Sequence, residues 1–364
     1  MPNLSCAIVG LPNVGKSTLF NALTKQMIAA NNFPFCTIDP NIGIVDVPDY
    51  RLEELLKITG SQKIVPASIS FVDIAGLVKG ASQGQGLGNQ FLSNIRETDL
   101  IVHLVRCFDN DDIIHVEGKV DPISDIEVIN LELILADLDV AEKIKVKLEK
   151  TMKGQKERPL ALDTLEKAIK HFNQNLPLRS LSLTPEEKES LKQFTFLTSK
   201  PIVYCANVSE KDLPSMDNHY VQKVREHAKK ESAPVVTICA KLEEDVAGLS
   251  ASEEKEYLDS YGIQEKGLNA LIRVSFATLG LITFYTAGEK EVRAWTVHKG
   301  ALAPEAAGKI HTDIQKGFIR AEVISYDDFV THKGRVGAKE AGRSRIEGKT
   351  YTVQDDDIVL FFHN

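Results

Sequence analysis

Six short apolar runs alternate with helix-like segments along the first two thirds of the chain, and this alternation is its main structural signal. The runs lie at Ser5–Val9, Ile42–Val47, Ile69–Ile74, Leu100–Val105, Ile202–Cys205 and Val235–Cys239. Near-continuous hydrophobicity is typical of parallel strands that helices cover on both faces. The pattern therefore predicts an α/β fold with a mostly parallel, doubly covered sheet.

The spacing breaks between the fourth and fifth runs, where much more chain intervenes than one crossover helix needs. Ser124-Asp125-Ile126-Glu127 has the form of a helix capping box, and apolar residues then recur every three or four positions up to Leu148. The pattern repeats from Leu162 to Phe172, and Thr184-Pro185-Glu186-Glu187 opens a further helix. We expect an α-helical hairpin inserted at about residues 124–198.

From about residue 281 the pattern changes to short β-type runs separated by Gly and Asp turns. These runs lie at Glu291–Val297, Arg320–Ile324, Thr350–Val353 and Ile358–Phe362. The sequence thus predicts two domains, a nucleotide-binding domain over residues 1–280 that includes the hairpin and a small α+β domain over residues 281–364.

A phosphate-binding motif follows the first apolar run. It reads Gly10-Leu11-Pro12-Asn13-Val14-Gly15-Lys16-Ser17, and a helix-like stretch begins at Thr18. The glycines let backbone N–H groups turn toward an anion, where the helix adds the positive end of its dipole. Lys16 would neutralise charge on the β- and γ-phosphates, a catalytic role, and Ser17 would bind Mg²⁺. The predicted nucleotide contacts here are Gly10, Asn13, Val14, Gly15, Lys16, Ser17 and Thr18.

Hydrolysis on such a scaffold also needs a second metal contact and a group that senses the γ-phosphate. Asp73-Ile74-Ala75-Gly76 ends an apolar run, so Asp73 would hold Mg²⁺ through water and the Gly76 N–H would contact the γ-phosphate. Thr37 is the candidate switch hydroxyl that would close on Mg²⁺. Leu77 stands where many GTPases carry the glutamine that orients water, and an aliphatic side chain cannot form that hydrogen bond. Intrinsic hydrolysis is therefore expected to be slow.

The base-binding loop departs from the guanine motif N-K-x-D. After the fifth run the chain has Asn207-Val208-Ser209-Glu210, so Val208 replaces the lysine and Glu210 is one methylene longer than the aspartate. Each lost contact of this kind costs about 1–3 kcal/mol, which is enough to remove a preference for guanine. The Asn207 amide has the donor and acceptor that an adenine edge requires. Cys239-Ala240-Lys241 occupies the place of the loop that borders the base. We therefore predict ATP binding in preference to GTP.

Together these motifs resemble those of the YchF family of Obg-related P-loop NTPases, the bacterial counterparts of Obg-like ATPase. The likeness covers nearly the whole chain. It includes N-F-P-F-C-T at Asn32–Thr37, D-I-A-G-L-V-K-G-A-S at Asp73–Ser82, N-I-R-E at Asn94–Glu97 and A-A-G-K-I-H-T-D at Ala306–Asp313. The resemblance implies ATP hydrolysis, a C-terminal TGS domain of β-grasp type, and association with ribosomes.

The resemblance bears on two further residues. His115 matches the family's candidate catalytic histidine, which could swing toward the γ-phosphate in place of the absent glutamine. Without the resemblance, the local sequence favours a histidine on the protein surface. Asn13 matches the P-loop asparagine of potassium-dependent relatives, so K⁺ is an optional cofactor; the alternative is an asparagine that only tightens the loop. Three functions stay open: an ATP-driven switch on ribosomes, an Obg-like GTP switch, and an adaptor in which nucleotide is a structural effector.

Charge and composition limit the partners. The 364 residues carry a formal net charge of −8, which disfavours a protein that coats DNA. Two regions are locally basic, with seven cations and two acids over residues 143–158, at the hairpin tip, and six cations and two acids over residues 333–349. They suit contacts with ribosomal RNA, although ordinary solvated faces are an equally good explanation.

The same composition indicates a cellular compartment. Five cysteines without a C-x-x-C pair are typical of free thiols in a reducing environment. The longest lipid-like stretch, residues 270–287, is interrupted by Arg273. We expect a cytoplasmic protein that binds neither DNA nor a membrane.

Overall fold

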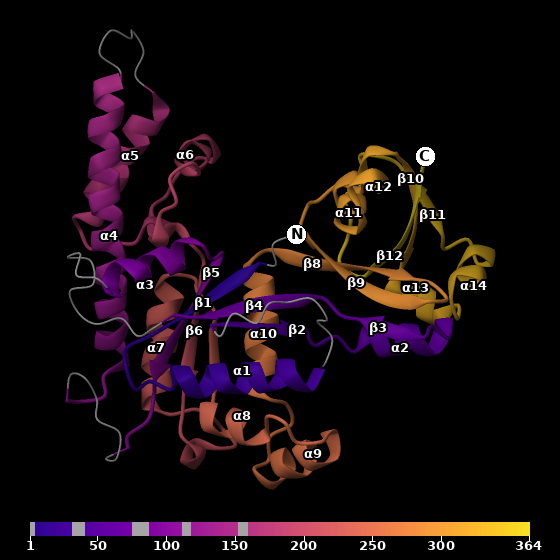
Figure 1. Ribbon diagram of the computed structural model, residues 1–364, viewed down its shortest axis with the longest axis horizontal. Helices are drawn as coiled ribbons and strands as arrows, with labels where there is room; N and C mark the ends of the chain where they lie inside the picture. Colours follow the sequence, from indigo (N-terminus) through magenta and orange to yellow (C-terminus); the bar gives the residue numbers. More distant parts are fainter. Residues whose placement is uncertain (1–3, 31–40, 75–86, 111–117, 152–158) are drawn as a thin grey trace. The chain divides into compact units, whose positions relative to one another are not determined.

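The computed structural model describes residues 4–30, 41–74, 87–110, 118–151 and 159–364, and the chain forms two compact units (Figure 1). The first unit comprises Met1–Val45 and Ser70–Leu271, and the second comprises Asp46–Ile69 and Ile272–Asn364. The segment Asp46–Ile69, which the sequence places in the nucleotide-binding domain, thus packs with the C-terminal residues.

A six-stranded sheet in the order β2-β4-β1-β5-β6-β7 forms the centre of the first unit. The pairings β4–β1, β1–β5, β5–β6 and β6–β7 are all parallel. Every residue of β5 and β6 is buried, as expected for strands covered on both faces. The bounds are β1 Ser5–Val9, β2 Ile42–Asp46, β4 Ser68–Asp73, β5 Leu100–Arg106, β6 Ile202–Asn207 and β7 Val235–Ile238. The predicted α/β fold is confirmed.

Helices alternate with these strands along the chain. They are α1 Lys16–Ala30, α3 Leu87–Arg96, α7 His219–Lys230, α8 Ala240–Val246, α9 Ala251–Ser260 and α10 Gly267–Thr278. Helix α7 begins at a side-chain cap, because the Asn218 oxygen accepts the N–H groups of Tyr220 and Val221. Helix α8 packs against α1.

The expected helical hairpin is present as α4, Pro122–Thr151, and α5, Leu160–Phe172, which lie side by side (Figure 1). The capping box expected at Ser124 was wrong, because α4 begins at Pro122 and Asp121 Oδ1 accepts the N–H groups of Ile123 and Ser124. The box at Thr184 is confirmed at the start of α6, Pro185–Leu191.

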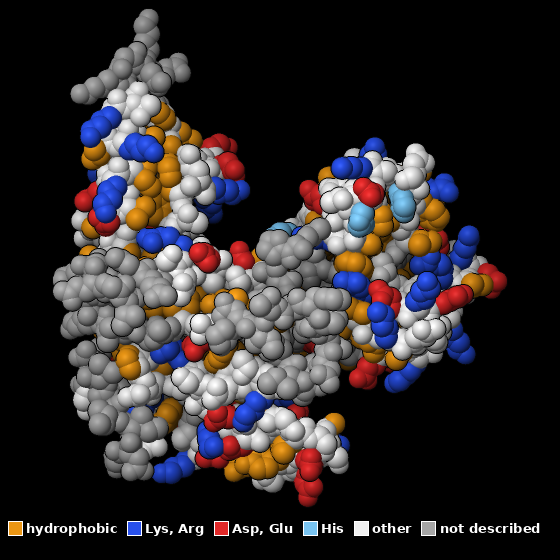
Figure 2. Space-filling model, viewed as in Figure 1, with side chains coloured by type: hydrophobic (Ala, Val, Ile, Leu, Met, Phe, Trp, Pro, Cys, Tyr) orange, Lys and Arg blue, Asp and Glu red, His pale blue; other side chains and the backbone are white. Residues whose placement is uncertain are grey.

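A separate apolar core holds the hairpin together. It contains Ile134, Ala141, Leu165, Ala168, Phe172, Leu178, Leu191 and Phe196. In Figure 2 a strip of hydrophobic side chains is visible along the hairpin. Leu138 and Ile144 are among the partly buried apolar residues that pack against this core. The Asp137 carboxylate fixes α4 to the chain before β6 by accepting the backbone N–H groups of Leu197 and Thr198 at 2.8 and 2.7 Å. The hairpin is therefore joined to the segment before β6 by polar as well as apolar contacts.

The second unit contains a six-stranded sheet in the order β11-β10-β12-β8-β9-β3. Helix α11, Ala303–Ile310, packs on it over a core that includes Phe284, Val297 and Val359. The run at Thr350–Val353 was wrongly predicted as a strand, since only an isolated bridge between Thr352 and Leu302 forms there. The bounds are β3 Lys63–Val65, β8 Leu281–Ala287, β9 Glu291–His298, β10 Phe318–Ser325, β11 Arg345–Glu347 and β12 Asp357–His363.

Three polar contacts within the second unit explain why Asp46–Ile69 belongs to it. This segment carries α2, Arg51–Thr59, and strand β3, which pairs with β9. Arg51 forms an ion pair with Asp356, and the Tyr285 hydroxyl donates to Asp49. The Tyr326 hydroxyl donates to Glu54. No helix among the described residues is long and apolar enough to cross a membrane.

Candidate nucleotide site

A cavity of about 830 Å³ lies where the loops after β1, β5, β6 and β7 meet. Ligands of open parallel sheets bind at this carboxyl edge of the strands. Seven of the predicted nucleotide-binding residues line the cavity: Asn13, Gly15, Thr18, Asn207, Val208, Glu210 and Ala240. The structure thus brings the P-loop and both base-loop motifs to one place.

Close approach of the backbone explains the two glycines of the P-loop. A Cβ on Gly15 would lie 2.4 Å from Asn207 Nδ2, and the Gly15 φ of +99° disfavours any other residue. A Cβ on Gly10 would lie 2.6 Å from the Leu104 carbonyl oxygen. Asn13 also has a positive φ, 63°, which asparagine tolerates better than most residues. The loop therefore keeps its backbone in a conformation that larger side chains would prevent.

Lys16 lies under this loop and is 9% exposed. Its Nζ donates to the carbonyl oxygens of Gly10 and Leu11, both at 3.1 Å, which uses two of its three donors. Burial lowers the pKa of Lys16, and the nearby Asp73 carboxylate acts in the opposite direction. The ammonium group is therefore held in place against the loop that would receive phosphate.

Two of the three predicted magnesium residues, Asp73 and Ser17, are described, and their positions are compatible with a divalent cation. Asp73 lies at the end of β4, and its buried Oδ1 has no hydrogen-bond partner among the described residues. Burial raises the pKa of Asp73, while Lys16 lowers it. A buried, unpaired carboxylate oxygen is the group that a cation or its bound water would satisfy. Ser17 is exposed at the start of α1, as a metal-binding hydroxyl must be.

Asn207 joins the phosphate and base ends of the cavity. It is 4% exposed; its Nδ2 donates to the Val14 carbonyl oxygen, and its Oδ1 accepts the Ala240 N–H, both at 2.9 Å. Sequence reasoning expected this amide at the base edge, and it missed these partners. A contact with adenine stays a prediction, and it would use the second hydrogen of Nδ2 and the second lone pair of Oδ1.

The other base-loop residues differ in accessibility. Val208 is buried, whereas Glu210 is exposed at the start of a 3₁₀ turn, Glu210–Asp212. Cys239 is fully buried and does not line the cavity; burial raises the pKa of its thiol to about 11. Cys239 would therefore shape the loop from within, while Ala240 lines the cavity.

One wall of the cavity escaped the sequence analysis. Phe108, Asp109 and Asn110, which follow β5, line it together with the residues of the P-loop and base loops. The run Cys107-Phe108-Asp109-Asn110 matches no phosphate or base motif. Only its place in the chain indicates that it lies at the site, because it follows the carboxyl end of a buried parallel strand between β1 and β6.

Three predicted residues, Thr37, Gly76 and His115, lie outside the described residues, as does Leu77. No group of three or more His, Cys, Asp or Glu side chains that could hold a metal occurs in the described ranges.

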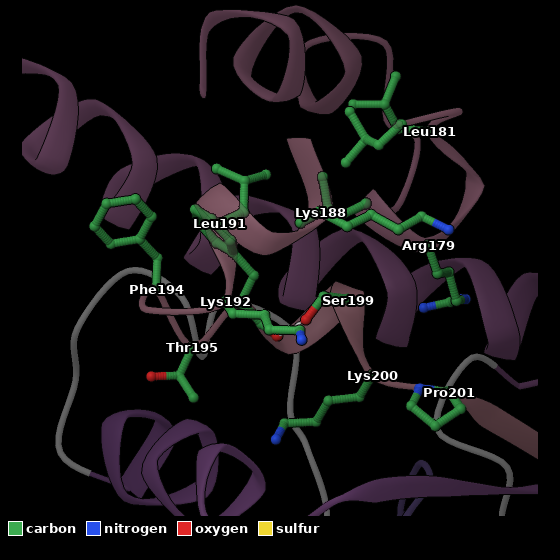
Figure 3. A pocket seen from close by; sticks show the side chains of 13 residues that line it. Arg179, Leu181, Lys188, Leu191, Lys192, Phe194, Thr195, Ser199, Lys200 and Pro201 are labelled. Atoms are coloured by element: carbon green, nitrogen blue, oxygen red, sulfur yellow. Dashed lines mark hydrogen bonds between the residues drawn. The ribbon is translucent and has the colours of Figure 1, made fainter. Parts of the chain in front are cut away.

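A second cavity, of about 540 Å³, lies on the helical insertion (Figure 3). Its lining combines apolar side chains such as Leu181, Leu191 and Phe194 with four cations, Arg179, Lys188, Lys192 and Lys200. None of the predicted nucleotide residues that the structure describes lines it. It is therefore a feature of the hairpin region and not part of the nucleotide site.

Comparison with known proteins gives matches over both parts of the chain. A family model described as a 50S ribosome-binding GTPase matches residues 5–157, and the YchF-GTPase C-terminal model, described as a protein of unknown function, matches residues 281–364. The ribosome-binding ATPase YchF of Escherichia coli O157:H7 is 55% identical over 360 residues, which is 99% of each chain. That of Bacillus subtilis (strain 168) is 52% identical over 363 residues, again 99% of each chain.

A solved structure is similar as well. The YchF GTPase of Schizosaccharomyces pombe superposes with a TM-score of 0.88 at 36% identity, and the match covers 100% of this chain and 99% of the other.

Proposed function

The chain belongs to the YchF family, and from this premise we propose that it is an ATPase that binds ribosomes and acts as a nucleotide-dependent switch. It binds ATP in preference to GTP and hydrolyses ATP slowly. Its place of action is the cytoplasm, where ribosomes work.

One observation carries the proposal: an intact phosphate cradle shares its cavity with a base loop that lacks the guanine contacts. Val208 is buried at the position where a lysine would cover guanine, and the longer Glu210 stands in place of the aspartate. A site built around those hydrogen bonds loses roughly 1–3 kcal/mol with each missing contact. Guanine therefore has no advantage over adenine here.

The residues of the phosphate end have separate roles. The P-loop N–H groups and Lys16 bind the β- and γ-phosphates, and Ser17 and Asp73 would hold Mg²⁺, which neutralises charge that develops during transfer. We assign Thr37 to the metal and the Gly76 N–H to the γ-phosphate. His115 is the proposed residue that orients water. Leu77 cannot take that role, so turnover without a partner is slow.

The basic regions are the proposed contacts with ribosomal RNA. On α4, Lys143 and Lys145 already pair with Asp139 and Glu166, at 2.6 and 3.1 Å. In the C-terminal basic region, Arg345 Nε lies 3.6 Å from Glu347 Oε1. Each region still has more cations than acids, so its positive electrostatic potential attracts RNA phosphates. Binding to ribosomes should therefore weaken as the salt concentration rises.

K⁺ remains an optional cofactor in this proposal. The left-handed backbone of Asn13, with φ at 63°, supports the simpler role of an asparagine that shapes the loop. Equal rates of ATP hydrolysis in Na⁺ and K⁺ would remove the potassium role.

The deciding experiment is a side-by-side titration of ATP and GTP in Mg²⁺. We expect ATP to bind at least tenfold more tightly. Tighter binding of GTP would establish the alternative, an Obg-like GTP switch. Single-turnover hydrolysis with and without ribosomes then tests the switch: stimulation by ribosomes supports it, whereas an unchanged slow rate favours the adaptor in which nucleotide is only a structural effector.

A further inference from the structure

Arg106, the last residue of β5, is a buried cation close to the nucleotide cavity. It is 2% exposed and is among the largest fully buried side chains of the described residues. Burying a guanidinium group is costly unless it is hydrogen-bonded, so its partners indicate what it is for.

Among the described residues, Arg106 donates hydrogen bonds to two carbonyl groups of the segment that follows it. Nε donates to the Phe108 oxygen and Nη2 to the Asn110 oxygen, both at 3.1 Å. The guanidinium carbon lies 4.8 Å from the centre of the Phe108 ring. One planar side chain thus fixes the backbone at two points and stacks against the ring between them.

Other contacts tie the same segment to β6 and to the start of α7. The Tyr220 hydroxyl donates to Asp109 at 2.9 Å, and Asn218 Nδ2 donates to the Cys107 carbonyl oxygen at 2.8 Å. The Cys107 N–H donates to the Asn207 carbonyl oxygen at 2.8 Å. The segment Cys107–Asn110, here called the β5 wall, is therefore held from three sides.

We propose that Arg106 is a positioning residue for the nucleoside: it holds the β5 wall so that Phe108 and Asn110 face the base and sugar of bound ATP. This inference rests on the proposed function, because it presumes that the cavity holds ATP. The phosphates bind at the P-loop, which is a different part of the cavity, so Arg106 should affect the nucleoside and not the triphosphate.

Lysine cannot reproduce this arrangement. Its ammonium group has no planar fork to reach two carbonyl groups at once, and it stacks less well on an aromatic ring. Arg106→Lys therefore keeps the charge but releases the β5 wall. The Arg179→Lys variant is a matched control, because the Arg179 side chain is only 11% exposed and also multiply bonded, to Glu231 and Asn130, but lines the other cavity.

The test compares Mg²⁺-dependent binding of ATP and of inorganic tripolyphosphate by calorimetry. For Arg106→Lys we expect ATP affinity to fall about tenfold and tripolyphosphate affinity to stay within twofold of the unsubstituted protein. Phe108→Leu should show the same selective loss, and Arg179→Lys should leave both affinities unchanged.

An equal loss of both affinities would mean that Arg106 only supports the fold, and unchanged ATP affinity would mean that the β5 wall does not touch the nucleoside. Either result overturns the inference. If the unsubstituted protein binds tripolyphosphate but not ATP, the proposed function itself fails, so the two failures can be told apart.

Discussion

The two ends of the nucleotide cavity are built in different ways. At the phosphate end, backbone from one short stretch forms the cradle, and its glycines are required because neighbouring atoms come within 2.6 Å of where a Cβ would stand. At the base end, side chains from three separate stretches meet, after β5, β6 and β7. For the proposed ATP site, we therefore expect phosphate recognition to tolerate little change and base recognition to be assembled from replaceable parts.

The largest effect is expected at Gly15. Gly15→Ala places a methyl group 2.4 Å from Asn207 Nδ2 on a backbone with φ of +99°, so the loop or Asn207 must move. We expect affinities for ATP, GTP and tripolyphosphate all to fall about 1,000-fold, which corresponds to roughly 4 kcal/mol. Calorimetric titration measures this.

Gly248→Ala is the matched control for that experiment. Its φ, +95°, is similar, but nothing lies within 4 Å of the added Cβ. Binding by this variant should stay normal. If Gly15→Ala also bound ATP normally, the cradle would not depend on close approach of the backbone.

The same difference explains what could be read from the sequence. Gly10–Ser17 was recognisable because its function depends on neighbouring backbone groups, and the six apolar runs predicted the sheet because burial follows local hydrophobicity. The β5 wall could not be recognised, since its partner Tyr220 is 111 residues away from Asp109. The roles of Thr37, Gly76 and His115 stay predictions.

Asn207→Asp tests the connection between the two ends. The new carboxylate would face the Val14 carbonyl oxygen in place of a donor, in a position that is 4% exposed. An uncompensated buried charge costs about 3 kcal/mol. We expect an approximately 100-fold loss of affinity for both ATP and tripolyphosphate, measured by titration.

Asn130→Asp is the control, because the Asn130 oxygen accepts from Arg179 and a carboxylate keeps that bond. A loss for ATP alone in Asn207→Asp would show that Asn207 serves the base end only, contrary to the connection seen here.

Glu243 makes the stability of the base end depend on pH. It is 1% exposed in α8, the helix that begins at the base loop, and burial raises its pKa to about 7. A glutamate in the unfolded chain titrates near 4.3, so the folded state binds this proton more strongly. The contribution of Glu243 to folding stability is therefore greatest at pH values below its pKa in the unfolded chain. It is lost as the pH rises through about 7, the pKa in the folded protein.

Glu243→Gln should remove this loss. We expect it to stabilise the protein at pH 8 by about 3 kcal/mol relative to its effect at pH 4.5, as measured by urea unfolding at both pH values. Glu226→Gln, on an exposed side chain of α7, is the control for loss of a surface carboxylate. An identical pH profile for Glu243→Gln and the unsubstituted protein would contradict the prediction.

The smallest effect is expected from rebuilding base recognition, and it tests the comparison most directly. The double change Val208→Lys with Glu210→Asp restores the guanine motif in a loop that already lines the cavity. Because the β5 wall and Asn207 stay as they are, we expect only a partial change, about tenfold in the ratio of GTP to ATP affinity. Parallel titrations of both nucleotides measure that ratio, and tripolyphosphate affinity, which should stay constant, shows that the cradle is intact. If the affinity ratio stays unchanged, base preference resides in the β5 wall and not in the Asn207–Glu210 loop. Exchanging single loops would then not change base recognition, although the base end is built from separate stretches.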